Sequence, residues 1–95
     1  MAAPITAPGN KRQLATYLND VLATLQSPAQ LEAEAERIIG TVRRIMRPYI
    51  QGERSSERQQ YYSLPVTQIE KAYAARDFEN FSFALDSLVG RIELE

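Results

Sequence analysis

The chain has 95 residues and a formal net charge of −1, and it contains neither cysteine nor histidine. A chain of this length is expected to form one domain around one modest core. Without cysteine, disulfides and thiolate chemistry are excluded, and without histidine the commonest general base and metal ligand is missing. We therefore expect a cytoplasmic, non-catalytic protein with no cofactor and no metal site.

The termini show no sign of a membrane or targeting segment. No stretch approaches the ~20 apolar residues that a membrane-spanning helix needs, and MAAPITAPGN lacks a charged region followed by an apolar run. Pro4, Pro8 and Gly9 favour a flexible arm over residues 1–9. Leu94 and Glu95 resemble a cloning remnant. The expected helical domain therefore covers residues 10–93, without contact to a membrane.

The first predicted helix covers about residues 10–26. Asn10 is a favourable N-cap residue, since its side-chain oxygen can accept a hydrogen bond from a free amide of the first turn. The apolar residues that follow recur at helical spacing and form one continuous face. They are Leu14, Tyr17, Leu18, Val21, Leu22 and Leu25.

The second predicted helix covers about residues 28–50. Ser27 and Gln30 match a capping box, with Pro28 in the first turn where proline is tolerated. On a helical wheel, one arc carries the apolar residues and the opposite arc carries the arginines. The apolar arc contains Leu31, Ala35, Ile38, Ile39, Val42, Ile45, Met46 and Tyr49. The arginine arc contains Arg37, Arg43, Arg44 and Arg47.

Residues 51–60 are predicted to form a polar loop or a frayed helix end. Pro48 should kink or end the preceding helix, and QGERSSERQQ has no apolar period. Apolar character returns shortly before Pro65, and Thr67 with Glu70 matches a second capping box. We therefore expect a short third helix over about residues 64–75.

The fourth predicted helix covers about residues 77–92. Asp77 is a favourable N-cap residue after a tight turn at Arg76 and Asp77. Apolar residues again recur at helical spacing, namely Phe81, Ala84, Leu85, Leu88, Val89 and Ile92. Short connections between neighbouring helices favour hairpins. The expected fold is all-α, a four-helix bundle built from two antiparallel αα-hairpins.

Two residues do not fit a bundle in which each helix buries one face. Phe83 lies about 200° around the helix from Phe81, on the same side as Gly90, so it should be exposed unless something covers it. Gly40 lies among the arginines, where it destabilises the helix by up to about 1 kcal/mol relative to alanine. These positions suggest the close approach of another surface.

The charge distribution offers a second candidate surface. Residues 37–58 carry six arginines and two glutamates, a net charge of +4, whereas the segments on either side are net negative. Arg43 and Arg47, four residues apart on a helix, repel each other unless an anion lies nearby. However, glutamates early and arginines late in a helix are also what the helix dipole favours.

Two hypotheses about function follow from these surfaces. The preferred one is a small protein–protein interaction module, an adaptor, assembly factor or regulatory subunit, that binds another protein or a second copy of itself. Its surface would be the outer faces of the second and fourth helices, with Arg37, Gly40, Arg43, Arg44, Arg47, Phe83 and Gly90. The alternative is RNA or DNA binding, with phosphate contacts and base stacking by Arg43, Arg47, Arg54, Arg58, Tyr61 and Tyr62. The sequence pI of about 5.5 argues against the alternative.

Overall fold

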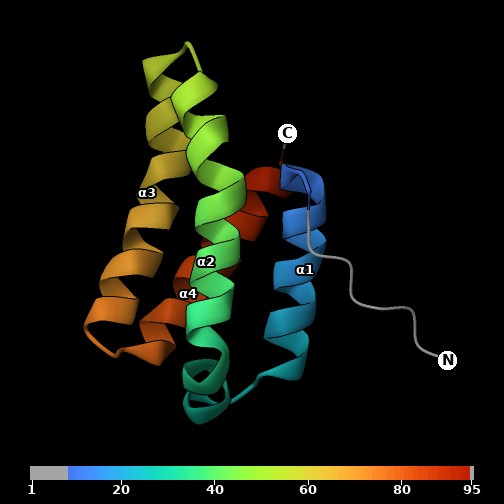
Figure 1. Cartoon of the computed structure of the whole chain (residues 1–95), viewed down its shortest axis with the longest axis vertical. Coiled ribbons are helices and arrows are strands. Elements are labelled where there is room, and N and C mark those ends of the chain that lie inside the picture. The colour runs from blue at the N-terminus through green and yellow to red at the C-terminus, as the bar shows by residue number, and fades with distance from the viewer. Residues whose placement is uncertain (1–8, 95) are drawn as a thin grey trace, which may run out of the picture.

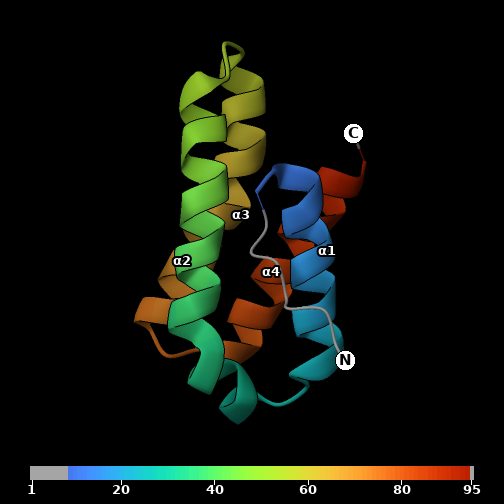
Figure 2. The same ribbon diagram turned by 45° about the vertical axis from the view of Figure 1, so that its right-hand side comes forward.

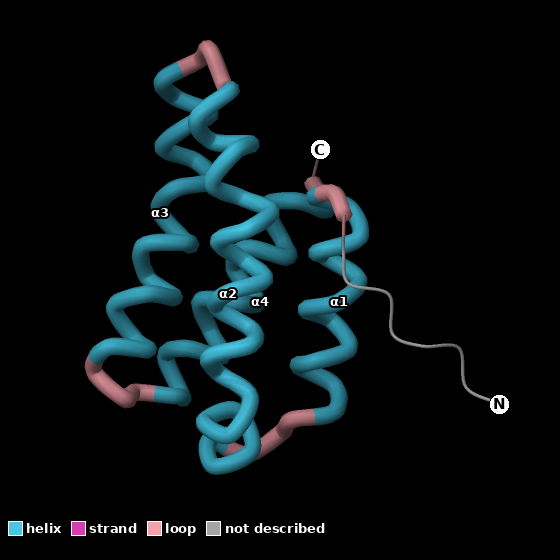
Figure 3. The backbone as a smooth tube through the Cα atoms, viewed as in Figure 1, coloured by secondary structure: helices cyan, strands magenta, loops and turns pink. Residues whose placement is uncertain are grey.

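Four α-helices make up most of residues 9–94, the part of the chain that the computed structural model describes (Figure 1). Their bounds are Lys11–Thr24 for α1, Pro28–Gly52 for α2, Ser56–Ala74 for α3 and Phe78–Glu93 for α4. No strand occurs within those residues, as the backbone tube in Figure 3 shows. The all-α prediction is therefore confirmed. The predicted arm lies, except for Gly9, outside the described residues, and so does Glu95.

The predicted helix starts of α1, α2 and α4 are confirmed by their caps. The side chain of Asn10 accepts a hydrogen bond from the Gln13 amide at 2.8 Å. Ser27 accepts one from the Gln30 amide at 3.2 Å, while the Gln30 side chain accepts from the Ser27 amide at 3.3 Å, which completes the capping box. The side chain of Asp77 caps α4 in the same way. Each cap satisfies amides that have no partner inside the helix.

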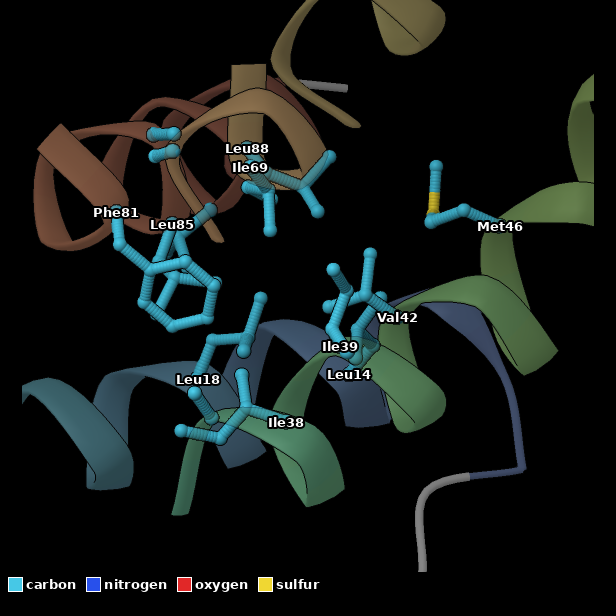
Figure 4. Close-up of a cluster of buried hydrophobic side chains, with 14 of the residues drawn as sticks. Leu14, Leu18, Ile38, Ile39, Val42, Met46, Ile69, Phe81, Leu85 and Leu88 are labelled. Carbon is cyan, nitrogen blue, oxygen red and sulfur yellow. The ribbon is translucent and has the colours of Figure 1, made fainter. Parts of the chain in front are cut away.

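The hydrophobic core lies where the apolar faces of the four helices meet. Figure 4 shows Leu14 and Leu18 of α1 close to side chains of the other helices, among them Phe81 of α4. Every residue of the three predicted apolar faces either belongs to this core or packs against it. Helix periodicity therefore predicted correctly which side of α1, α2 and α4 is buried.

Helix α4 is the central element of the packing. It contacts each of the other three helices, most extensively α3 and then α1. The consecutive helices α1 and α2 have the least extensive contact of the five contacting pairs. These contacts are compatible with a bundle, whereas the predicted pairing into two antiparallel hairpins stays a prediction. Figures 1 and 2 show that the joined ends of α2 and α3 project beyond α1 and α4.

The predicted polar loop over residues 51–60 is wrong, because α2 continues to Gly52 and α3 begins at Ser56. Side chains close the short connection that remains. The side-chain nitrogen Nε2 of Gln59 donates to the backbone carbonyls of Ile50 at 3.2 Å and Glu53 at 2.8 Å. Ser55 accepts a hydrogen bond from the Arg58 amide at 3.3 Å and so caps α3. Because polar side chains satisfy both helix ends here, no apolar period is needed to form the turn.

The predicted start of the third helix near residue 64 is also wrong. Pro65 and Thr67 both lie inside α3, so Thr67 and Glu70 do not form a capping box. Upstream of the proline, Tyr62 is 1% exposed, and its ring packs edge-on against Tyr49 of α2 at a centroid distance of 5.5 Å. This buried aromatic contact stabilises the part of α3 that local sequence signals assigned to a loop.

Helix α3 ends in a Schellman motif. The amide of Asp77 donates to the Ala72 carbonyl at 2.9 Å, and the amide of Arg76 donates to the Tyr73 carbonyl at 3.1 Å. Arg76 adopts the left-handed conformation that this motif requires, with φ of 57°. The motif makes the turn tight, and it brings α4 directly alongside α3.

Candidate interaction surfaces

The predicted arginine face is present on the outer side of α2. Arg37, Gly40, Arg43, Arg44 and Arg47 are all exposed. Two of the arginines have carboxylate partners within the chain. The Arg37 Nε lies 3.8 Å from Glu34 of the same helix, and the Arg43 Nε donates to Glu70 Oε1 of α3 at 2.9 Å. Much of the positive charge on this face is therefore compensated from inside the molecule.

The Arg43–Glu70 pair removes the main physical argument for an anion ligand. Repulsion between Arg43 and Arg47 favoured an external anion, but the Glu70 carboxylate supplies the negative charge from the neighbouring helix. The two paired side chains are 46% and 39% exposed, so the pair is weak, as half-exposed ion pairs are. No external anion is required to explain why these arginines lie together.

The residues of the predicted nucleic-acid surface do not form one stacking platform. Tyr62 is a core residue, which is a correction to its expected role, since a buried ring cannot stack on a base. Tyr61 is 38% exposed. Arg54 is exposed in the connection between α2 and α3, and the Arg58 Nε lies 3.6 Å from a Glu53 carboxylate oxygen.

Lys11 contacts the hydroxyl groups of a tyrosine cluster, in which the rings of Tyr49 and Tyr61 pack edge-on against Tyr62. Its ammonium group donates to the Tyr49 hydroxyl at 2.7 Å and to the Tyr62 hydroxyl at 3.5 Å. The same nitrogen lies 4.0 Å from the centroid of the Tyr49 ring. These contacts tie the start of α1 to α2 and α3, so the cluster has a structural explanation that needs no ligand.

Phe83 is strongly exposed, as its position off the apolar face of α4 predicts. Its exposed fraction is 72%. It lines an open groove of about 500 Å³ between α3 and α4, together with Leu64, which is 54% exposed. Ala72 and Ala84, both buried, also line this groove. Small side chains on two adjacent helices leave a hollow beside a large exposed ring.

A second, smaller hollow continues this apolar surface. It has a volume of about 300 Å³, and its lining includes Tyr61 and Leu94, which is 81% exposed. Arg91 lines both hollows. All four large hydrophobic side chains that are exposed within residues 9–94 therefore line these two neighbouring hollows. We call Tyr61, Leu64, Phe83, Arg91 and Leu94 the α3/α4 surface.

Arg91 is held in place by α3. Its guanidinium donates to the backbone carbonyl of Tyr61, and its Cζ lies 4.7 Å from the centroid of the Tyr61 ring. In an uninterrupted helix, this carbonyl would accept a hydrogen bond from the amide of residue 65, but Pro65 has no amide hydrogen. The proline therefore creates an acceptor on α3 that Arg91 of α4 fills, and the arginine is fixed between the two hollows.

The exposure of Phe83 is predictable from the sequence, whereas Leu64 and the groove were not predicted. Leu64 lies off the buried face of α3, as Phe83 lies off that of α4. This can be seen only when the helix is continued back through Pro65, because the buried residues Tyr62, Pro65, Ile69 and Ala72 then define the inner face. The signal that could have revealed the groove is that Leu64 and Phe83 are both apolar residues outside the buried faces of two helices joined by a tight turn.

Gly40 and Gly90 are not required by packing within the chain. A Cβ atom built at either position meets no atom within 4 Å. Both positions thus leave room for an approaching surface, and the prediction that one approaches there stays open. Gly90 precedes Arg91 on α4, whereas Gly40 lies on α2, within the arginine face.

The described residues hold no obvious site for metal chemistry. No group of three or more acidic side chains within residues 9–94 lies close enough together to bind a metal ion. Across the same residues, none of the helices combines the length and the apolar character needed to cross a bilayer.

Comparisons of the chain with protein-family models, with curated proteins and with solved structures gave no match in any of the three.

Proposed function

We propose that this protein is a non-catalytic interaction module that binds another polypeptide through the α3/α4 surface. An adaptor, an assembly factor and a regulatory subunit would each need such a surface. The supporting observation is that the four large hydrophobic side chains exposed within the described residues gather around two hollows that share Arg91. Scattered exposed apolar residues are ordinary on proteins, whereas gathered ones are typical of binding surfaces.

The residue types of the α3/α4 surface fit a protein partner. Tyrosine, phenylalanine and arginine are enriched at the centres of protein–protein interfaces, and they contribute most of the binding energy there. Phe83 projects beside a groove whose lining includes three alanines as well as polar side chains. Arg91 is already held by the Tyr61 carbonyl, so its ordering would cost little entropy on binding.

The scaffold in this proposal is the pair of antiparallel αα-hairpins expected from the sequence, α1 with α2 and α3 with α4. The extensive contact between α3 and α4 supports the second pair, as does the tight turn that joins them. The groove lies between two closely packed helices, so it is already formed before a partner binds. A rigid groove favours affinity, because less conformational freedom is lost.

The outer face of α2 is the weaker candidate within this proposal. Two of its arginines pair with carboxylates of the chain, and its exposed surface carries no large apolar side chain. Binding of RNA or DNA there would depend on the exposed arginines of this face, together with Arg54. We keep this as the rival that the experiment must separate.

The test compares capture by three immobilised variants in a lysate of the source organism. Phe83→Asp places a charge in the proposed surface, Ala33→Asp adds the same charge at an exposed position of α2, and Arg47→Glu reverses a charge on the arginine face. We expect wild type, Ala33→Asp and Arg47→Glu to retain the same polypeptide, and Phe83→Asp to lose it. Retention by Phe83→Asp would contradict the proposal, and nuclease-sensitive capture lost only in Arg47→Glu would favour the rival.

A further inference from the structure

We propose that the occupant of the α3/α4 groove is the same groove of a second copy of this chain, so that the protein forms a two-fold symmetric dimer. This inference rests on the proposed function, because it names the partner of that surface. Its first support is that one face carries both a projecting group and a hollow. Phe83 projects, and the groove beside it is lined by the small side chains of Ala72, Ala75 and Ala84.

A two-fold axis makes such a face self-complementary. In a symmetric dimer the same patch serves both subunits, so a projection on one copy must meet a hollow on the other. When the axis runs along the groove, α4 of each copy lies opposite α3 of the other. Phe83 of one copy then enters the alanine-lined groove of the other, and the reciprocal contact forms at the same time.

The charges beside the groove are complementary under this symmetry. On α4, the exposed carboxylates Glu79 and Asp86 lie one turn to either side of Phe83. On the opposite wall of the groove, α3 presents the exposed ammonium of Lys71. The two-fold arrangement therefore brings the carboxylates that flank Phe83 of each copy toward Lys71 of the other, while Arg91, which also lines the α4 side of the groove, stays beside Tyr61. Opposite charges in such positions select a partner and its register.

The net charge also permits self-association. At −1 per chain, two copies repel each other only weakly at long range. So small a net charge does not favour a strongly acidic or a strongly basic partner. The groove region carries both carboxylates and an ammonium group, so it is complementary to a surface that also carries both charges. This matching is why a second copy is favoured over an unrelated amphipathic helix.

The first test measures self-association by sedimentation equilibrium across a series of protein concentrations. We expect wild type to shift from monomer to dimer, and Phe83→Asp to weaken the dimer at least about 30-fold, as loss of a buried aromatic anchor does. Ala33→Asp should dimerise as wild type does. A wild-type protein that stays monomeric at every concentration, or a dimer that Phe83→Asp leaves unchanged, would overturn the inference.

The second test uses charge reversal to check the symmetry. Lys71→Glu places carboxylates opposite the carboxylates beside Phe83, and Glu79→Lys with Asp86→Lys places ammonium groups opposite Lys71, so each protein alone should dimerise several-fold more weakly than wild type. Mixed in equal amounts, they should form a heterodimer about as tight as the wild-type dimer, because every opposed pair is again of opposite charge. If mixing restores nothing, the proposed arrangement is wrong. Circular dichroism checks that each variant remains helical.

The two proposals can fail separately. A monomeric protein that still captures another polypeptide in a Phe83-dependent way keeps the proposed function and rejects the second copy as partner. A protein whose capture and self-association are both indifferent to Phe83→Asp rejects the proposed function, and this inference fails with it.

Discussion

The guanidinium of Arg91 on α4 donates a hydrogen bond to the backbone carbonyl of Tyr61 on α3. That carbonyl is available because Pro65, four residues later, has no amide hydrogen to donate. A proline inside a helix leaves one backbone carbonyl without its intrahelical hydrogen bond, and here a side chain of the neighbouring helix donates to that carbonyl. The bond joins α3 to α4 at the point where the two hollows of the α3/α4 surface meet.

The first prediction is that the cost of losing Arg91 depends on Pro65. Arg91→Met should destabilise the protein by about 1 kcal/mol, because it removes a partly exposed, charge-assisted hydrogen bond. With Pro65→Ala in the background, the restored amide can bond to the Tyr61 carbonyl, and the cost of Arg91→Met should fall. A double-mutant cycle by urea unfolding measures the difference, since the packing lost with Pro65 cancels. If Arg91→Met lowers the free energy of unfolding equally in both backgrounds, Pro65 and Arg91 act independently.

The second prediction concerns the left-handed residue at the end of α3. Arg76 has φ of 57°, a conformation that glycine adopts without steric cost. Arg76→Gly should therefore stabilise the protein by about 0.5–1 kcal/mol in thermal or urea unfolding. Arg76→Ala is the matched control, because it removes the same side chain but keeps the strain. The prediction is wrong if the glycine variant is no more stable than the alanine variant.

Helices α1, α2 and α4 follow closely from the sequence because the signals that define them are local. Asn10, Ser27 and Asp77 each cap a helix through their own side chains, and each cap is followed by an apolar face at helical spacing. Caps and periodicity can be read within about a dozen residues. For this reason α1, α2 and α4 were predicted with their buried faces.

Helix α3 could not be predicted in the same way, because what stabilises it is remote in sequence. Tyr62 is buried against Tyr49, and the carbonyl made available by Pro65 is bonded by Arg91 of another helix. Locally, the proline and the polar run before it indicate a loop. The groove was missed for the same reason, since Leu64 joins Phe83 only when α3 extends through Pro65. Phe83 itself was found because its own helix was read correctly.

The third prediction tests whether the outer face of α2 takes part in binding. A Cβ atom at residue 40 meets nothing within 4 Å, so Gly40→Ala should stabilise the helix by about 0.5–1 kcal/mol. If partners bind at the α3/α4 surface, the variant should also self-associate and capture polypeptide as wild type does. Thermal unfolding and sedimentation check the two parts. Weaker association in the more stable variant would instead place the close approach of a partner at Gly40.

The fourth prediction concerns the Arg43–Glu70 pair. A double-mutant cycle with Arg43→Met and Glu70→Gln should give a coupling of about 0.2–1 kcal/mol, which falls as salt is added, because both side chains are half exposed. Glu70→Gln also leaves Arg43 without its carboxylate. The Glu70→Gln variant should therefore bind single-stranded DNA more tightly than wild type at low salt, as measured by fluorescence anisotropy. Unchanged DNA binding would show that Glu70 does not compensate the arginine face.

If partners bind at the α3/α4 surface, a cross-linking group placed on that surface should capture them. A photo-reactive benzoylphenylalanine replaces Phe83 in one protein and Arg47 in another, and both are irradiated in a lysate of the source organism. Both positions are exposed, so the reagent can react from either. We expect covalent adducts to polypeptide from position 83 and few or none from position 47. Adducts that form from position 47 while position 83 gives none would contradict this prediction.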